Sequence, residues 1–233
     1  MSAELSRISV IVPVYNHATY VAQALRSALD QSFPAHEILL VDDGSTDGSA
    51  EVAAGIPGVK VLRRSNGGAG AARNTGLRAA TGEAFAFLDA DDRWHPDKLR
   101  LQREALLRRP ELDMVFSMAR QFLSPDLSEA ERAQRKLEQE VVPGRLIWTM
   151  LIRRASFERV GEFREDLRTA EFVDWYARAQ ALGLEDEMLP EVLYERRIHA
   201  SNHGVRERNA RGDYFRALKA SIDRKRATEG LES

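Results

Sequence analysis

Short apolar runs alternate with amphipathic stretches through the first hundred residues, and this alternation constrains the fold more than any other feature. Compact, mostly apolar runs, the first of them β-branched, predict four strands, at 8–12, 38–41, 59–62 and 85–88. Residues 18–31 carry apolar side chains at helical spacing, and two further helices are expected to follow the second and third strands. Apolar strands separated by amphipathic helices are typical of a parallel sheet covered on both faces. We therefore expect a single α/β domain.

The second half of the chain is less regular. The expected elements are a helix at 96–108, a strand at 114–118, a charged surface helix or mobile loop at 124–140, an apolar segment at 146–163, a helix at 171–182, a strand at 192–198 and a charged helix at 206–226. The last of these could cover the sheet or pair with a second subunit, so the oligomeric state stays open.

Composition excludes several classes of function. A chain of 233 residues suits one well-buried domain. It has no cysteine, which excludes disulfide scaffolds, thiolate metal sites and thiol catalysis. The net charge of -2 gives no electrostatic reason to bind nucleic acid or an anionic membrane. No apolar stretch is long enough for a transmembrane segment, and no signal peptide is apparent. We expect a soluble, cytoplasmic protein that could lie against the inner face of the membrane.

Polar clusters follow all four predicted strands of the first half. Tyr15 and Asn16 follow the first strand, Asp42 and Asp43 the second, Asn66 and its glycines the third, and the segment 89–92 the fourth. Ligands of such sheets bind beyond the carboxyl ends of the strands. These clusters, scattered along the chain, are therefore expected to converge on one site.

Asp89-Ala90-Asp91-Asp92 places three carboxylates within four residues at the end of an apolar strand. Like charges this close repel one another, so a cation is expected to hold them together. Carboxylates suit Mg²⁺ or Mn²⁺, which also coordinate phosphate oxygens. An isolated cluster of this kind would be a solvated turn, but its place among other polar strand ends favours a metal site.

Two further segments are ambiguous when taken alone. The turn that contains Asp42 and Asp43 is rich in residues that make ordinary turns. The glycine-rich stretch 66–70 opens a helix that carries Arg73 one turn inside. Such an entry allows close approach of the backbone, and arginine can pair with a diphosphate. A flexible loop with a surface arginine is an equally good interpretation.

Five segments together resemble the successive signatures of the family-2 glycosyltransferases. They are Val12-Pro13-Val14-Tyr15-Asn16, Val41-Asp42-Asp43-Gly44-Ser45-Thr46-Asp47, Asn66-Gly67-Gly68, Ala72-Arg73-Asn74-Thr75-Gly76 and Phe87-Leu88-Asp89-Ala90-Asp91-Asp92. The resemblance continues more loosely through 151–154, 160–163 and 197–202. It implies a GT-A fold with a Rossmann-like, mostly parallel sheet, and metal-assisted hexosyl transfer with inversion from a nucleotide-sugar, in particular a UDP-sugar. The acceptor would be a saccharide, a lipid-linked molecule or a peptide, with bacterial glycoconjugate assembly as the setting.

The resemblance also divides the chain and assigns roles. One domain would cover 1–226, with a nucleotide-sugar half at about 1–110, an acceptor-side half at about 111–205 and a C-terminal helix at about 206–226. The implied roles are contact with the base for Pro13, Tyr15 and either Asp42 or Asp43, with the nucleotide for Arg73 and with the ribose for Asp89. Mn²⁺ or Mg²⁺ would be bound by Asp91, alone or with Asp92, and His199 would lie near the metal as a further ligand. A histidine held in a surface loop is the alternative for His199.

The sequence departs from the family where the catalytic base is expected. The family carries a Glu-Asp pair at the start of a helix, but here phenylalanine, Phe172, follows Glu171. Asp174 lies two positions after Phe172, about 200° further around a helix of 3.6 residues per turn. We expect at most one of the two carboxylates to replace the missing group. Glu171 is the first candidate, and Asp174 would serve only if the helix were shifted in register.

Three other functions compete with this interpretation. A nucleotidyltransferase would carry a glycine-rich phosphate loop after the first strand, where this chain has Pro13 to His17. A dinucleotide-dependent oxidoreductase would have GxGxxG at the same place. A non-catalytic or impaired sugar-nucleotide-binding homologue is supported directly only by Phe172.

Overall fold

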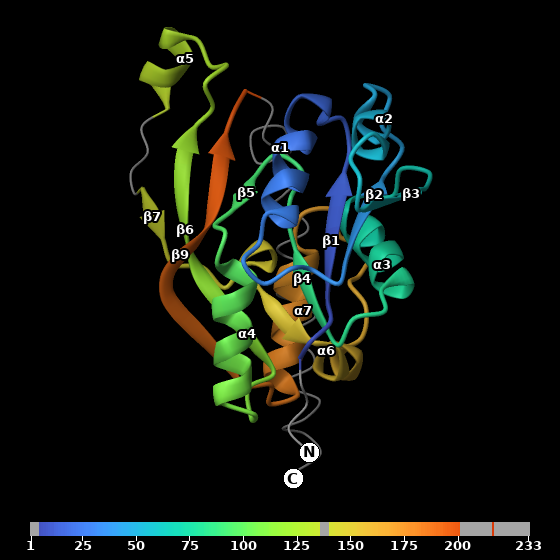
Figure 1. Cartoon of the computed structure of the whole chain (residues 1–233), viewed down its shortest axis with the longest axis vertical. Helices are drawn as coiled ribbons and strands as arrows, with labels where there is room; N and C mark the ends of the chain where they lie inside the picture. The colour runs from blue at the N-terminus through green and yellow to red at the C-terminus, as the bar shows by residue number, and fades with distance from the viewer. Residues whose placement is uncertain (1–4, 136–139, 201–215, 217–233) are drawn as a thin grey trace.

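One curled sheet of nine strands runs through the residues that the computed structural model describes, which are 5–135, 140–200 and 216 (Figure 1). The strands are β1 (Ile8–Val14), β2 (Glu37–Asp42), β3 (Val59–Arg63), β4 (Ala84–Phe87), β5 (Arg93–Trp94), β6 (Met114–Leu123), β7 (Val141–Val142), β8 (Leu151–Arg153) and β9 (Asp186–Ile198). The helices are α1 (Ala18–Leu29), α2 (Ser49–Ala54), α3 (Ala69–Ala79), α4 (Lys98–Arg108), α5 (Glu129–Gln134), α6 (Arg154–Val160), α7 (Glu171–Ala181) and the 3-10 turn η1 (Ile147–Thr149). The strand order is β3-β2-β1-β4-β8-β6-β9-β5, with β7 paired to β6.

The first half of the sheet is wholly parallel, as the sequence predicts. β1 lies between β2 and β4, and β3 completes the edge beside β2. Side chains along β1 alternate between two buried clusters: Val10 and Val12 enter one, and Ile11 enters the other. Both faces of this half are therefore apolar, which explains why its strands are continuous apolar runs in the sequence.

Helices cover both faces of the sheet. Apolar side chains of α1, α2 and α4 pack in the cluster that contains Val10, and those of α3, α6 and α7 pack in the cluster that contains Ile11. α3 lies especially close to the strands, because a Cβ atom at Gly76 would be 2.7 Å from Cγ2 of Ile11. Among the described residues, no helix combines the length and the apolar character needed to cross a membrane.

The second half of the sheet is mixed. β8 is inserted between β4 and β6 and is antiparallel to both, whereas β6 and β9 pair in parallel along most of their length. The strand predicted at 114–118 continues to Leu123, and the strand predicted at 192–198 begins earlier, at Asp186. The short strands β5, β7 and β8 were not predicted, because two or three residues are too few to show an alternation of apolar and polar side chains. The pairing of β6 and β9 shifts register on both sides of Met118.

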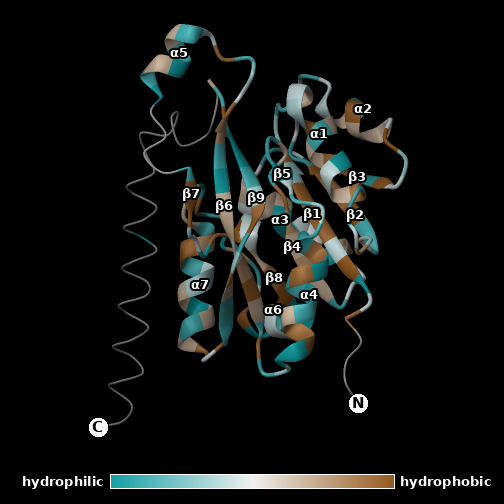
Figure 2. Ribbon diagram, turned by 60° about the vertical axis from the view of Figure 1, so that its left-hand side comes forward, coloured by the Kyte–Doolittle hydropathy of each residue, from teal (hydrophilic) through white to brown (hydrophobic). Residues whose placement is uncertain are grey.

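The outer ends of β6 and β9 extend beyond the rest of the sheet toward α5 and are largely hydrophilic (Figures 1 and 2). α5 begins with a capping box, in which Ser128 and Glu131 each bond the other's backbone N–H. It confirms a charged surface helix within the predicted 124–140 segment, although residues 136–139 lie outside the described part. The helix predicted at 206–226 also lies outside the described residues, except for Arg216.

Candidate active site

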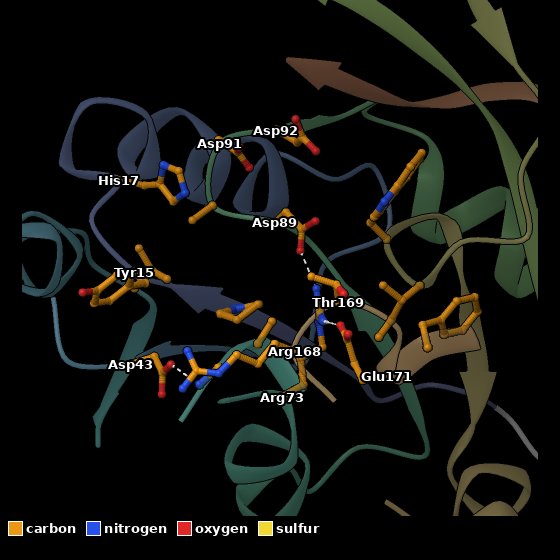
Figure 3. A pocket seen from close by; sticks show the side chains of 18 of the residues that line it. Tyr15, His17, Asp43, Arg73, Asp89, Asp91, Asp92, Arg168, Thr169 and Glu171 are labelled. Atoms are coloured by element: carbon orange, nitrogen blue, oxygen red, sulfur yellow. Dashed lines mark hydrogen bonds and ion pairs between the residues drawn. The ribbon is translucent and has the colours of Figure 1, made fainter. Parts of the chain in front are cut away.

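A pocket of about 460 Å³ opens at the carboxyl ends of the parallel strands (Figure 3). Its walls come from the segments after β1, β2 and β4, from the start of α3, from the turn around η1 and from the start of α7. The predicted site residues that line it are Pro13, Tyr15, Asp43, Arg73, Asp89, Asp91, Asp92 and Glu171. The strand-end clusters therefore converge, as the parallel sheet predicts.

Arg73 joins the two sides of the pocket. Its guanidinium donates from Nη2 to Oδ1 of Asp89 at 2.8 Å and from Nη1 to Oε1 of Glu171 at 2.6 Å (Figure 3). Burial alone would lower the pKa of Arg73, but the charges of Asp89 and Glu171 outweigh burial and raise it. The arginine is thus a permanent buried cation, held between a carboxylate at the end of β4 and another at the start of α7.

Glu171 is the carboxylate on the α7 side of the pocket. It is 7% exposed, and its side chain lies beside the start of α3, where a Cβ atom at Gly70 would be 3.4 Å from Cγ of Glu171. Burial raises the pKa of Glu171, and the opposing charge of Arg73 only partly offsets this. Phe172 follows it and also lines the pocket, with its ring stacked on Trp175.

His17 and Asp91 line the opposite end of the pocket, where they meet the fully buried side chain of His199, which is not among the lining residues. One ligand atom from each of His17, Asp91 and His199 lies within 4.8 Å of the other two, and Nε2 of His199 is 2.9 Å from Oδ2 of Asp91. Burial would raise the pKa of Asp91, but the hydrogen bond with His199 and the two imidazoles hold it below its usual range. Figure 3 shows His17 and Asp91 at one end, away from Glu171.

Asp92 is held by protein groups. Oδ2 accepts a hydrogen bond from the hydroxyl of Tyr194 at 2.8 Å, and Oδ1 accepts one from the backbone N–H of Arg197 at 2.6 Å. Burial, together with the charges of Asp91 and Asp89, raises the pKa of Asp92 well above its ordinary value. The carboxylate therefore anchors β9 to the loop after β4, while Asp91 points into the His17–His199 cluster.

The two aspartates at the end of β2 have different surroundings. Asp43 lines the pocket and accepts hydrogen bonds from Arg64, at 2.7 Å, and from the backbone of Gly67 and Gly68. Gly68 has φ of +91°, a conformation that favours glycine, so the glycine-rich entry to α3 is fixed on Asp43. Asp42 instead accepts from the backbone N–H of Ser45 within its own turn and is not among the residues that line the pocket.

Asp174 lies behind the pocket. It is 1% exposed, and its Oδ2 accepts a hydrogen bond from Nε of Arg178 at 3.0 Å, four residues along α7. Arg178 also donates to the backbone carbonyls of Val160 and Glu162. This network ties α7 to the end of α6, and Asp174 is not among the residues that line the pocket, whereas Glu171 is.

Sequence reasoning missed His17 and most of the pocket wall from the second half. His17 follows directly on Tyr15-Asn16, so its place beyond the first strand could have marked it. The turn at 146–148 gave no such signal, because apolar residues in a single sequence look the same whether they fill a core or line a pocket.

The fold is similar to that of solved glycosyltransferase structures. TarS 1-349 of S. aureus, in complex with UDP-GlcNAc, matches with a TM-score of 0.72 at 22% identity, over 92% of this chain and 65% of that chain. The mannosyltransferase PcManGT of Pyrobaculum calidifontis, in complex with GDP-Man and Mn²⁺, matches with a TM-score of 0.64 at 23% identity, over 85% and 59%. The likenesses confirm the GT-A fold that the sequence predicts.

Comparison of the sequence with known families shows to which family the chain belongs. The family described as glycosyl transferase family 2 matches residues 9–161, and the chain belongs to that family. An uncharacterised glycosyltransferase of Rickettsia prowazekii is 32% identical over 210 residues, which are 83% of this chain and 64% of that relative. This chain therefore spans less than two thirds of the relative's length.

Proposed function

We propose that the chain transfers a sugar from a nucleotide-diphosphate donor, most simply a UDP-sugar, to an acceptor hydroxyl with inversion at the anomeric carbon. One observation carries this proposal: a single pocket is lined at one end by His17 and Asp91, which meet the buried His199, and at the other by a buried, arginine-held carboxylate, Glu171. Family membership and the donors named in the structures of TarS and PcManGT support the same reaction.

The donor nucleotide would occupy the side formed by the parallel strands. Tyr15 is 39% exposed and lines the pocket with Pro13, so it can lie against a base. Asp43 would accept hydrogen bonds from the base, and Asp89 from the ribose. Arg73 would hold the nucleotide by fixing Asp89. We assign no contact with the donor to Asp42, because it is not among the residues that line the pocket.

His17, Asp91 and His199 fit a divalent cation, because two imidazoles and one carboxylate offer nitrogen and oxygen ligands from three directions. Nitrogen ligands suit Mn²⁺ better than Mg²⁺, which prefers oxygen. A bound Mn²⁺ would neutralise charge on the departing nucleotide diphosphate. We propose that Asp92 does not bind the ion but fixes the loop that carries Asp91.

Glu171 would act as the general base. In an inverting transfer, the acceptor oxygen bonds to the anomeric carbon as the bond from that carbon to the diphosphate oxygen breaks, and the acceptor proton passes to a carboxylate. Arg73 fixes Oε1 of Glu171, and burial raises the pKa of the carboxyl toward the range where proton transfer is efficient. Asp174 is bound by Arg178 away from the pocket, so we do not assign it this role.

The non-catalytic alternative rests on Phe172 and is not favoured, since Glu171 puts a carboxylate on the same wall. We retain the division of one domain, over 1–226, into a nucleotide-sugar half to about 110, an acceptor-side half to about 205 and a C-terminal helix.

Calorimetric titration of UDP, with and without Mn²⁺, tests the proposal. We expect Mn²⁺ to tighten UDP binding, and we expect Asp91→Ala to remove this effect. Glu158→Ala, at an exposed position on α6, is the control and should bind like the unchanged chain. If UDP does not bind with any divalent ion, and GDP does not bind either, the transferase proposal is wrong.

A further inference from the structure

Five apolar side chains line the pocket from the second half of the chain, together with the polar residues Arg168, Thr169, Glu171 and Arg196. The five apolar residues are Leu146, Ile147 and Trp148 from the turn at η1, and Phe172 and Val173 from the first turn of α7. We call this set the apolar wall. It comes from two segments that are separated in sequence, and Ile147 of one segment and Phe172 of the other belong to the same buried cluster.

The apolar wall is open to solvent where a ligand would meet it. Leu146 is 36% exposed and Val173 is 44% exposed. Across the described residues, the large apolar side chains with such exposure are Tyr15, Val52, Leu146, Val173 and Leu182, and three of these line this pocket. Single exposed apolar residues are ordinary, but their concentration in one pocket marks a surface for a ligand.

The apolar wall is also held in place from behind. The ring of Phe172 stacks on Trp175 at 6.1 Å and on Tyr176 at 5.9 Å. The ring of Trp148 packs against Tyr194 at 4.5 Å. Rings fixed in this way lose little conformational entropy when a ligand covers them. The surface is therefore ready to bind without rearrangement.

Most of the acidic side chains that could bind a sugar's hydroxyls lie on the other side of the pocket, whereas the polar residues that line it from the second half are Arg168, Thr169, Glu171 and Arg196. Asp43, Asp89 and Asp91 all follow parallel strands, where the nucleotide-sugar is proposed to lie. A stacked saccharide could use aromatic rings, but aliphatic side chains such as Leu146 and Val173 offer it neither a hydrogen bond nor a ring face.

We propose that the acceptor carries an apolar group, aryl or branched alkyl, next to the hydroxyl that receives the sugar. This group would cover the apolar wall, and the hydroxyl would then lie at Glu171. Phenylalanine in place of the family's aspartate at position 172 serves the same purpose, since it adds a ring to the wall. The inference rests on the proposed transferase function for the identity of the occupant.

The test compares two ligands that differ only in their apolar part. Methyl and phenyl β-D-glucopyranoside are titrated by calorimetry into the full chain, with Mn²⁺, in the presence and absence of UDP. We expect the phenyl compound to bind about tenfold more tightly, the equivalent of about 1.4 kcal/mol. Val173→Asp should remove that advantage, and so should Leu146→Asp. Leu182→Asp, on an exposed side chain that is not among those lining the pocket, should keep it.

Binding of UDP is measured on the same samples. If Val173→Asp still binds UDP but loses the preference for the phenyl compound, the apolar wall is the acceptor surface. Equal binding of both glucosides to the unchanged chain, no binding of either, or a preference that survives both wall variants overturns the inference. Failure of UDP to bind, with the phenyl preference intact, would instead count against the proposed donor site.

Discussion

The two halves of the sheet build their sides of the pocket in different ways. The parallel half, β1 to β4, presents polar side chains that are fixed by hydrogen bonds: Asp43 by the backbone at Gly67 and Gly68, and Asp89 by Arg73. The mixed half presents the apolar wall, the carboxylate of Glu171 and the polar residues Arg168, Thr169 and Arg196. The first side suits a charged, hydroxyl-rich ligand, and the second suits an apolar one.

This difference predicts that nucleotide and metal binding depend on the parallel side, and that acceptor choice and the transfer rate depend on the mixed side. Substitutions on the parallel side should change how the nucleotide and its metal bind. Substitutions on the mixed side should change which acceptor is used or how fast the transfer occurs. Arg73 is the exception, because it contacts a carboxylate from each half. The following predictions test whether the separation holds.

Glu171→Gln should give the largest effect, a fall in the transfer rate of roughly 10²- to 10⁴-fold, because it removes the proposed base. Binding of UDP should change little, since this carboxyl lies on the mixed side. In the unchanged chain, the base works only when deprotonated, so the rate should rise with pH through the raised pKa of Glu171. The fall of the transfer rate at low pH should therefore occur at a higher pH than an ordinary carboxyl group would give. This pH dependence should be absent from Glu171→Gln.

Steady-state transfer rates as a function of pH, with calorimetry of UDP, make this measurement. Asp174→Asn is the matched comparison on the same helix. If it abolishes transfer while the protein stays folded and Glu171→Gln does not, the base is Asp174 and the helix assignment is wrong.

His17→Ala should give an intermediate effect, about a tenfold loss of Mn²⁺ affinity, corresponding to one lost ligand at about 1.4 kcal/mol. The ratio of the affinities for Mn²⁺ and for Mg²⁺ should also be smaller in the variant than in the unchanged chain, because one nitrogen ligand is gone. Nitrogen couplings in the electron spin echo of bound Mn²⁺ would report the number of imidazoles. His95→Ala, at a half-exposed position outside the pocket, is the control. Unchanged couplings in His17→Ala would exclude this histidine as a ligand.

Lys98→Met should affect stability alone. Lys98 is fully buried on α4, donates to Gln102 and lies over the ring of Trp94, and burial lowers its pKa to about 7. Below about pH 7, Lys98 is charged in the folded chain although it is buried. Between about pH 7 and pH 10.5, Lys98 is neutral in the folded chain but still protonated in the unfolded chain. The unfolding free energy of the unchanged chain should therefore rise with pH in this window, by at most about 1.4 kcal/mol per unit.

Denaturant unfolding of both proteins from pH 6 to pH 10 measures this effect. The advantage of the methionine variant should be greatest near pH 6 and should shrink as pH rises. A difference that is independent of pH would show that Lys98 keeps its ordinary pKa when folded. Binding of UDP should be the same in both proteins, because neither side of the pocket is changed.

The parallel half was predictable from sequence, and the mixed half largely was not. Loops after parallel strands must meet at one edge, so Tyr15, Asp43, Asp89 and Asp91 could be placed together without coordinates. β8 spans three residues, and β9 begins with the polar pair Asp186 and Glu187, so neither shows a clear period. Their positions depend on pairing with distant strands, which sequence alone does not reveal.

The surroundings of individual side chains were harder to predict than the position of the site. Asp42, Asp92 and Asp174 look like ligands or catalysts in sequence, yet each carboxylate is bound by neighbouring protein groups. Conversely, His17 becomes a candidate ligand only because the end of β9 brings His199 beside Asp91. Whether a polar side chain meets a ligand or a neighbouring protein group depends on the direction in which it points. The periodicity of the sequence does not predict that direction.

The insertion of β8 has a consequence for the order in which the molecule can be made. β4 and β6 leave the ribosome before β8, yet neither can take its final neighbour until Leu151 to Arg153 has been synthesised. Until then, each presents a bare apolar edge, and such edges pair readily with other chains. The sheet cannot be completed until this three-residue strand has been made, and the other edge of β6 stays open until β9 follows from Asp186.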